Sequence, residues 1–317
     1  MNEIIIYGAG KKGVECLDYM KWRGIDSLCR CFADRNFIGL QGAGRESELG
    51  KEIIPPERLA EFNLPVVVAI NDINGEVLKS LCERGIKAYS FDDFYKAIGE
   101  NRNVHIREYL AYVHARSNDV YFENAEEQDA LNIFWGGYSP FLEMFNKLDL
   151  SNVIELACGW GRHVKNYYDR ADKITLVDIL QENIDICKKR FAEYDTQGKI
   201  CYYKNDGYDY GDLKSGEYTA VFSYDAMVHF EMLDVYSYLC DTYRILKTGG
   251  MALFHHSNYG SEPEMDFRGT IHARNYMTSD LFRYLVYRSG LEIVEQRLID
   301  WDGNKELDCL SLLVKRN

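Results

Sequence analysis

The first part of the chain alternates short apolar runs with stretches whose apolar residues recur at helical spacing. The apolar runs are EIIIYG, LCRCFAD, LPVVVAI and KAYSF, and the helical stretches include residues 11–23 and 74–84. Buried strands that alternate with helices are typical of a parallel sheet with helices on both faces. Residues 36–56 are rich in glycine and polar side chains. We therefore expect a long loop there, which leaves four strands in this part of the chain.

Residues 91–150 show a different pattern, which is mostly helical, charged and aromatic. One helix is predicted over residues 100–119 and another over residues 126–148, and the second is interrupted by two glycines and a proline, namely Gly136, Gly137 and Pro140. We divide the chain accordingly into a first domain of residues 1–100, a helical linker of residues 101–134 and a second domain of residues 135–317.

The alternation of strand and helix resumes in the second domain. The predicted strands are NVIELA, KITLVD, KICYYK, YTAVFSY and GMALFHH, and helices are predicted near residues 161–170, 181–194, 234–246 and 278–289. The end of the chain instead reads as two strands around the turn DGN, so that the last strand should run antiparallel to its sheet. The pattern as a whole predicts an α/β protein with two Rossmann-like domains.

Composition narrows the classes of protein that fit this pattern. The 317 residues are 46% hydrophobic and 27% charged, which is typical of a globular protein. The net charge of -13 argues against a large nucleic-acid partner, which usually meets a basic surface. No apolar run reaches the ~18 residues that a membrane span needs, and the start MNEIIIYG does not resemble a signal peptide. Nine cysteines without CxxC spacing indicate reduced thiols, and we expect a cytoplasmic protein.

The stretch ELACGWGRH follows the first strand of the second domain. Gly159 and Gly161 allow a ligand to approach the backbone closely, and Glu155 lies at the end of the strand. Asp178 ends the next strand, where an acid can accept both hydroxyls of a ribose. Asp206 follows the third strand and is able to accept from an adenine amino group. Each residue also has a purely structural alternative, because aspartate commonly caps a helix or stabilises a turn.

Taken in this order, these residues resemble those of class I S-adenosylmethionine-dependent methyltransferases, over residues 135–317. The resemblance rests on Glu155, Ala157, Gly159, Gly161, Asp178, Asp206, and on Gly249 and Gly250 in ILKTGGMALFHHSN. Ala157 departs from the family, which has its first glycine there. The resemblance implies a seven-stranded sheet with an antiparallel seventh strand and S-adenosylmethionine as cofactor. We include Tyr224, at the end of the fourth strand, among the cofactor-binding residues.

A hydroxyl acceptor needs a base that takes its proton. The candidates are His229, His255 and His256, which all follow or end strands at the carboxyl edge of the sheet. Neighbouring residues of a strand point to opposite faces, so one of His255 and His256 must point away from the site. A packed core histidine is the alternative reading for each. Candidates for the substrate pocket are Trp135, Tyr138 and His272, although Trp135 and Tyr138 fit a packed core equally well.

The acceptor class follows from what the second domain lacks. Its fourth strand is not followed by the Asn/Asp-Pro-Pro-Tyr turn typical of amino-group methyltransferases, and no Pro-Cys pair is present for attack on a pyrimidine. Together with the acidic charge, this favours O-methylation of a small acceptor: a sugar, a nucleotide-sugar or a polysaccharide-related molecule. Asp225, His256 and His272 are usable metal ligands, but their spacing requires no metal, and we expect none.

The loop YGAGKKG at the N-terminus fits GxGxxG at Gly8, Gly10 and Gly13, and Asp34 ends the next strand. These residues are candidates for a nucleotide site. Residues 3–98 resemble the N-terminal domain of polysaccharide-biosynthesis sugar acyltransferases, where the acid-rich stretch faces a nucleotide-sugar or a partner subunit. The ligand of this loop stays open, and so does a purely structural role.

Two alternative functions differ in class from the methyltransferase. An NAD(P)-dependent oxidoreductase would use the N-terminal loop, but a substrate domain other than the methyltransferase-like domain is missing. A non-catalytic S-adenosylmethionine-binding module would keep the acids and glycines without turnover. The expected partner is a small-molecule acceptor, without nucleic acid or membrane, and the domain organisation is compatible with a homodimer.

Overall fold

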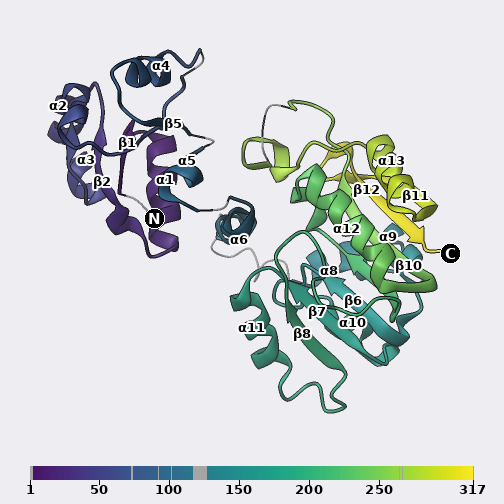
Figure 1. Cartoon of the computed structure of the whole chain (residues 1–317). Coiled ribbons are helices and arrows are strands. Elements are labelled where there is room, and N and C mark those ends of the chain that lie inside the picture. Colours follow the sequence, from purple (N-terminus) through teal and green to yellow (C-terminus); the bar gives the residue numbers. More distant parts are fainter. Residues whose placement is uncertain are drawn as a thin grey trace. The chain divides into compact units, whose positions relative to one another are not determined.

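The structure is a computed structural model that describes residues 3–72, 74–91, 93–100, 102–116, 127–263, 265 and 267–316. It separates into two compact units, Met1–Tyr109 and Leu110–Asn317, which are treated one at a time below (Figure 1). Helix α6 (Arg102–Ala115) crosses the boundary between the units. Residues 117–126 of the predicted helical linker lie outside the described residues.

Unit 1 contains a five-stranded parallel sheet with the order β3-β2-β1-β4-β5. The strands are β1 (Ile4–Tyr7), β2 (Cys29–Ala33), β3 (Ile53–Ile54), β4 (Val66–Val68) and β5 (Ala88–Ser90). The helices are α1 (Lys11–Trp22), α2 (Phe37–Gly42), α3 (Arg45–Leu49), α4 (Glu76–Glu83) and α5 (Phe94–Ile98). The parallel pairing of the strands, the buried apolar residues of β1, β3 and β4, and the helices between the strands confirm the predicted parallel α/β unit.

The prediction of a long loop at residues 36–56 is wrong. This segment forms α2, α3 and β3, and β3 pairs in parallel with β2 through Phe32 and Ile53. A strand of two residues is too short to show a period of its own. Its pairing with β2 and its burial produce the strand, and these are tertiary effects.

Unit 2 contains a seven-stranded sheet with the order β11-β12-β10-β9-β6-β7-β8. Its strands are β6 (Val153–Leu156), β7 (Ile174–Asp178), β8 (Ile200–Lys204), β9 (Tyr218–Ser223), β10 (Leu246–Ser257), β11 (Glu292–Trp301) and β12 (Asn304–Val314). Strands β6 to β10 run parallel, whereas β12 is antiparallel to both β10 and β11. The predicted seven-stranded sheet with an antiparallel terminal hairpin is confirmed.

Helices cover both faces of this sheet (Figure 1). One face packs against α8 (Gln128–Trp135), α9 (Pro140–Phe145), α10 (Val164–Tyr167) and α11 (Gln181–Phe191). The other face packs against α12 (Met232–Ile245) and α13 (Ser279–Ser289). The helix predicted from residue 161 begins only at Val164, because residues 157–163 form turns with positive φ at both glycines. These turns leave backbone exposed at the carboxyl end of β6, where the site lies.

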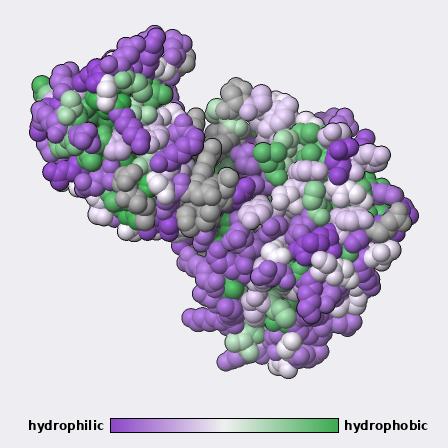
Figure 2. All heavy atoms as spheres, viewed as in Figure 1, coloured by the Kyte–Doolittle hydropathy of each residue, from purple (hydrophilic) through white to green (hydrophobic). Residues whose placement is uncertain are grey.

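The surface fits a polar, acidic chain. Figure 2 shows mainly hydrophilic residues on the viewed face, with apolar residues in small separate groups. Among the described residues, no helix combines the length and hydropathy needed to cross a membrane.

The glycine loop of unit 1 yields a stability prediction. A Cβ at Gly13 would lie 1.9 Å from the carbonyl oxygen of Gly8, whereas a Cβ at Gly10 would meet nothing within 4 Å. Alanine in a helix normally stabilises by ~0.5–1 kcal/mol relative to glycine. At Gly13 the contact with backbone should reverse that sign and destabilise unit 1 by ~1–3 kcal/mol or more.

Urea unfolding of Gly13→Ala measures this change, with Gly10→Ala as the matched control. The control should cost less than ~1 kcal/mol. Equal stability of the two variants would contradict the close packing of α1 on β1.

Candidate functional site

The site lies at the carboxyl edge of the sheet in unit 2. Strands β7 and β9 flank β6, and their connections leave in opposite directions from it, so the strand order reverses between β6 and β9. Open α/β sheets bind ligands at such a switch point, outside the carboxyl ends of the strands. The predicted acids and glycines follow β6, β7 and β8, and the predicted histidines follow or end β9 and β10.

The loop after β6 is held by the acid that ends β7. Asp178 is buried, and its Oδ2 accepts a hydrogen bond from the backbone N–H of Gly159 at 2.9 Å. Its Oδ1 accepts from the N–H of Leu180 at 2.9 Å and from Nδ2 of Asn183 at 3.1 Å. Burial raises the pKa of Asp178 more than these hydrogen bonds lower it. Asp178 therefore caps the turn that follows β7, which is the structural role considered for it from the sequence. It also holds the glycine loop in place.

Two positions of the loop show why its sequence matters. Ala157 has a φ of +56°, in the left-handed region that favours glycine, at the place where the family has its first glycine. Gly161 has a φ of +74°, and a Cβ there would come within 2.6 Å of the Phe191 ring of α11. The loop thus stores backbone strain at Ala157 and packs directly on α11 at Gly161.

Glu155 is buried in β6 and faces α10. The hydroxyl of Tyr167 donates to its Oε2 at 2.7 Å, while its Oε1 is buried without a partner among the described residues. Burial raises the pKa of Glu155 to about 8, although the Tyr167 hydrogen bond and the charges of Arg162 and Arg190 act to lower it. The side chain is therefore protonated at neutral pH in the free protein, and a cation could ionise it.

At the end of β8, the predicted Asp206 is exposed. Its neighbour Asn205 is buried and donates from Nδ2 to the carbonyl of Asp209 and to the hydroxyl of Tyr238, each at 2.7 Å. Its Oδ1 is buried without a partner among the described residues. Asn205 was not predicted, because asparagine before Asp-Gly reads as an ordinary turn.

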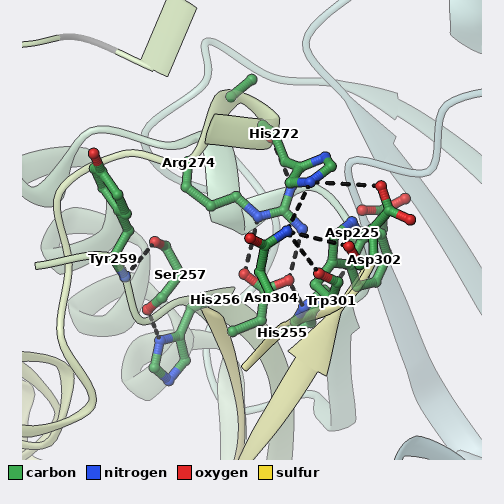
Figure 3. Close-up of polar contacts among 12 residues, drawn as sticks. Asp225, His255, His256, Ser257, Tyr259, His272, Arg274, Trp301, Asp302 and Asn304 are labelled. Atoms are coloured by element: carbon green, nitrogen blue, oxygen red, sulfur yellow. Dashed lines mark hydrogen bonds and ion pairs between the residues drawn. The ribbon is translucent and has the colours of Figure 1, made fainter. Parts of the chain in front are cut away.

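The two adjacent histidines of β10 face opposite sides of the sheet. His256 is stacked on Phe282 of α13 at 3.6 Å between ring centroids, and it bonds to the Ser257 carbonyl and the Ser311 hydroxyl. It points away from the group around Asp225 in Figure 3. The prediction of His256 as a catalytic base, and its use as a metal ligand, are therefore wrong. His256 is a packed core histidine, because side chains alternate along a strand and this one is turned to the α13 face.

His255 belongs to a buried polar chain (Figure 3). Its Nδ1 accepts from the backbone N–H of Asp225 at 3.0 Å, so its Nε2 carries the hydrogen and donates to Oδ2 of Asp308 at 3.0 Å. Arg274 donates to both oxygens of Asp308, at 2.9 and 2.6 Å, and its guanidinium lies 4.8 Å from the centre of the Trp301 ring. With both ring nitrogens engaged, His255 is unsuited to take a proton from an acceptor.

Asp225 connects this chain with the glycine loop. Its φ of +54° is left-handed, and its Oδ2 accepts from Nη2 of Arg162 at 3.0 Å. Burial acts to raise the pKa of Asp225, but the charges of Arg162, His255 and His229 and the Arg162 hydrogen bond together outweigh burial and lower the pKa. Arg162, Arg274 and Asp308 were not predicted. The sequence does carry one sign of Asp308, because an acid there stands within the mainly apolar stretch LDCLSLLV.

His229 lies in η5 (Met227–His229), just after β9. Its Nδ1 lies 2.6 Å from the Ala273 carbonyl oxygen, which can only accept, so the hydrogen is on Nδ1 and the lone pair is on Nε2. The ring of His114 lies 4.2 Å away. Burial, followed by the proximity of His114, lowers the pKa of His229 to about 3, so the ring is neutral at neutral pH.

The three predicted pocket residues lie in different places. Trp135 packs against Phe141 and Phe145 and donates from its indole N–H to Nδ1 of His163 at 3.0 Å, which matches the core alternative. Tyr138 is fully exposed, so it is not the wall of a pocket in this unit. His272 lies at the terminal hairpin, where its Nε2 accepts from Asn304 at 3.1 Å.

Tyr224, predicted among the cofactor residues, is buried between aromatic rings. Its ring centroid lies 4.3 Å from that of Phe134 and 4.5 Å from that of His255. Burial raises the pKa of its hydroxyl, which therefore stays protonated. Tyr224 thus joins the aromatic packing of α8 to the polar chain of His255.

The glycine loop of unit 1 is closed in the same way as that of unit 2. Oδ2 of Asp34 accepts from the N–H of Ala9 at 3.0 Å. A cleft of about 710 Å³ opens beside the loop, at the carboxyl ends of β1 and β4, where the strand order of this sheet reverses. Its lining includes Tyr7, Arg35, Asp72 and Arg84, but not the three glycines or Asp34.

No group of three or more potential metal ligands is present in the described part of the chain. Of the three ligand types noted in the sequence, His256 faces the opposite side of the sheet from Asp225, because β10 turns successive side chains to opposite faces.

Comparison with known proteins agrees with this geometry. Residues 153–250, from β6 into β10, match the model of a family described as a methyltransferase domain. No curated protein sequence matches the chain. The crystal structure of an S-adenosylmethionine-dependent methyltransferase from Mesorhizobium loti is 16% identical, with a TM-score of 0.46, over 57% of this chain and 99% of that one.

A second similar structure is that of geranyl diphosphate C-methyltransferase from Streptomyces coelicolor A3(2), in complex with Mg²⁺, geranyl diphosphate and S-adenosyl-L-homocysteine. It is 12% identical, with a TM-score of 0.46, over 55% of this chain and 76% of that one. At these identities the likeness concerns the fold alone.

The buried groups at the ends of β6, β7 and β8 fit S-adenosylmethionine. The unpartnered Oε1 of Glu155 suits a ligand ammonium, and the carboxylate of Asp178 suits ribose hydroxyls. The unpartnered Oδ1 of Asn205 suits an amino donor such as that of adenine. When bound, the cofactor supplies an electrophilic methyl on a positively charged sulfur.

Glu155 gives a pH-dependent prediction. In the unfolded chain it ionises near its ordinary pKa of 4.5, whereas the folded protein keeps it protonated up to about pH 8. Its contribution to stability is therefore full below pH 4.5 and is lost as the pH rises to about 8. Glu155→Gln removes this titration, so it should stabilise the ligand-free protein at pH 8 by on the order of a few kcal/mol relative to the wild type, and have little effect at pH 4.5.

Thermal unfolding of both proteins at the two pH values tests this, and titration with S-adenosylhomocysteine should show weaker binding by the variant. A stability difference that does not change with pH would show that Glu155 is already ionised in the folded protein.

Three independent observations in unit 2 agree. The sheet order and terminal hairpin are those of the class I fold, and a glycine loop with three strand-end acceptor groups lies at its switch point. The segment that carries this loop matches the methyltransferase family model. Residues 153–250 of unit 2 therefore match a methyltransferase domain within a sheet of the class I order, and S-adenosylmethionine is its cofactor.

Proposed function

We propose that the protein transfers the methyl group of S-adenosylmethionine to a hydroxyl oxygen of a small acceptor, a sugar, nucleotide-sugar or polysaccharide-related molecule. Alignment of acceptor, methyl and sulfur supplies most of the rate in such a transfer, because the sulfonium is a good leaving group. The enzyme must also remove the proton of the hydroxyl. The environment of His229 is the observation that supports this proposal.

His229 has the arrangement expected of a proton acceptor. Its Nδ1–H is bound to the carbonyl of Ala273, which orients the ring and leaves the lone pair on Nε2. Because burial lowers its pKa to about 3, the ring is neutral and able to accept a hydrogen bond from a hydroxyl. The negative charge of Asp225 favours the imidazolium that forms when the proton arrives.

The cofactor site consists, in this proposal, of the predicted strand-end groups. Glu155 binds the ammonium, Asp178 binds the ribose, and Asp206 together with its buried neighbour Asn205 binds the adenine. The residues Ala157, Gly159, Gly161 and Tyr224 form the walls around these groups.

The acidic chain and the N-terminal unit support the acceptor class. The net charge of -13 is unsuited to nucleic acid, and the acidic stretch ending in Asp34 resembles a domain that faces nucleotide-sugars. The residues Gly8, Gly10, Gly13 and Asp34 form a candidate nucleotide site in unit 1, for recognition of a nucleotide-linked acceptor. Screening nucleotide-sugars for release of S-adenosylhomocysteine tests the acceptor class.

Asp178→Ala should weaken S-adenosylhomocysteine binding by ~1.5–3 kcal/mol, the value of a hydrogen bond to a charged group. Calorimetric titration measures it, and Asp206→Ala serves as a comparison at the exposed neighbouring acid. Wild-type affinity in Asp178→Ala would remove this residue from the cofactor site.

His229→Ala should lower turnover by ~10²–10⁴ and leave the affinity for S-adenosylhomocysteine unchanged. The matched control is His272→Ala, at a partly exposed histidine of the same edge. Wild-type turnover in His229→Ala would exclude a base at this position.

A further inference from the structure

The polar chain around His255 does more than fill the core. It begins at Arg274, passes through Asp308 of β12 and His255 of β10, and ends at the backbone N–H of Asp225. His255, Asp308 and Arg274 are all at most 2% exposed. Its four members come from four separate segments of the polypeptide, and each bond fixes the orientation of the next group.

The direction of each bond follows from the donors and acceptors. A backbone N–H can only donate, so Nδ1 of His255 must be unprotonated and Nε2 must carry the hydrogen. Asp308 accepts that hydrogen and is kept ionised: burial would raise its pKa, but the bonds from His255 and Arg274 lower it to about 2. Arg274 and Asp308 therefore select one tautomer of His255.

The hydrogen-bonded polar chain ends at a strained turn, at Asp225. Asp225 holds a φ of +54°, which costs free energy for a residue with a Cβ. The bond from its N–H to His255 stabilises this conformation, and the turn brings the carboxylate to Arg162 at 3.0 Å. Arg162 lies in the glycine loop, two residues before α10 begins. A change at His255 would thus reach the cofactor loop through Asp225.

We propose that His255 is a positioning residue of the cofactor site, which holds the left-handed turn at Asp225 so that Asp225 anchors Arg162 and the glycine loop. The inference rests on the S-adenosylmethionine site of unit 2. Asp308 and Arg274 act one step further away, by fixing the tautomer of His255. The terminal hairpin is in this way a part of the cofactor site, although β10 and β9 lie between β12 and β6 in the sheet.

Two substitutions of His255 test the roles of its two ring nitrogens separately. In His255→Asn, the amide oxygen takes the place of Nδ1 and can still accept from Asp225. In His255→Gln, the amide nitrogen takes the place of Nε2 and can still donate to Asp308, but the acceptor for Asp225 is lost. A residue that only fills space, or only satisfies Asp308, would not favour asparagine over glutamine.

The experiment is calorimetric titration of the full-length wild type and variants with S-adenosylhomocysteine. We expect His255→Gln to bind about tenfold more weakly than the wild type, the loss of one hydrogen bond, and His255→Asn to stay within about threefold. His256→Asn, the neighbouring histidine on the other face, is the control and should keep wild-type affinity, whatever its melting temperature.

Equal losses in the two variants, or a larger loss in His255→Asn, would overturn the proposal. Nitrogen-15 NMR of the wild type gives a test that does not depend on folding of the variants. A proton on Nε2 of His255 and none on Nδ1 is expected, and the opposite tautomer would overturn the chain of bonds. A wild type that does not bind S-adenosylhomocysteine would contradict the cofactor assignment itself, which is a different result.

Discussion

The loop that carries the cofactor groups depends on one hydrogen bond, from the backbone N–H of Gly159 to the carboxylate of Asp178. The acid ends β7 and the glycine follows β6, so the bond joins the ends of two neighbouring strands at the switch point of the sheet. Asp34 and Ala9 repeat it in unit 1. A buried carboxylate is costly unless it is hydrogen-bonded. In each sheet, the hydrogen bond offsets the cost of burying the acid and also fixes the glycine loop at the carboxyl edge.

Among the described residues of unit 2, the buried side-chain atoms without a hydrogen-bond partner include two at the predicted cofactor site, and others lie at Asn152, before β6, and at Ser223, at the end of β9. Oε1 of Glu155 and Oδ1 of Asn205 are unpartnered at the ends of β6 and β8, on either side of Asp178. Such atoms reduce the stability of the free protein. A ligand that supplies donors to these two atoms would gain the corresponding free energy on binding.

The end of β9 is fixed by a different set of hydrogen bonds. At the end of β9, Asp225 adopts a left-handed turn, and the groups that hold it come from β10, β12 and the segment before α13. Within the same turn sequence, His229 is fixed by the Ala273 carbonyl. The segment around residues 272–274 thus contributes to both residues.

The sequence alone determined the elements and the place of the site. Apolar runs and acids after strands predicted β6, β7 and β8, the terminal hairpin and the edge at which Glu155 and Asp178 lie, because these signals are local. Tertiary structure decided the roles within that edge. It turned His255 and His256 to opposite faces, exposed Tyr138, packed the partly buried Trp135 against the core, and joined Arg274 to Asp308 across 34 positions of the chain. Side-chain direction and ion pairing depend on residues distant in sequence, and a linear pattern does not contain that information.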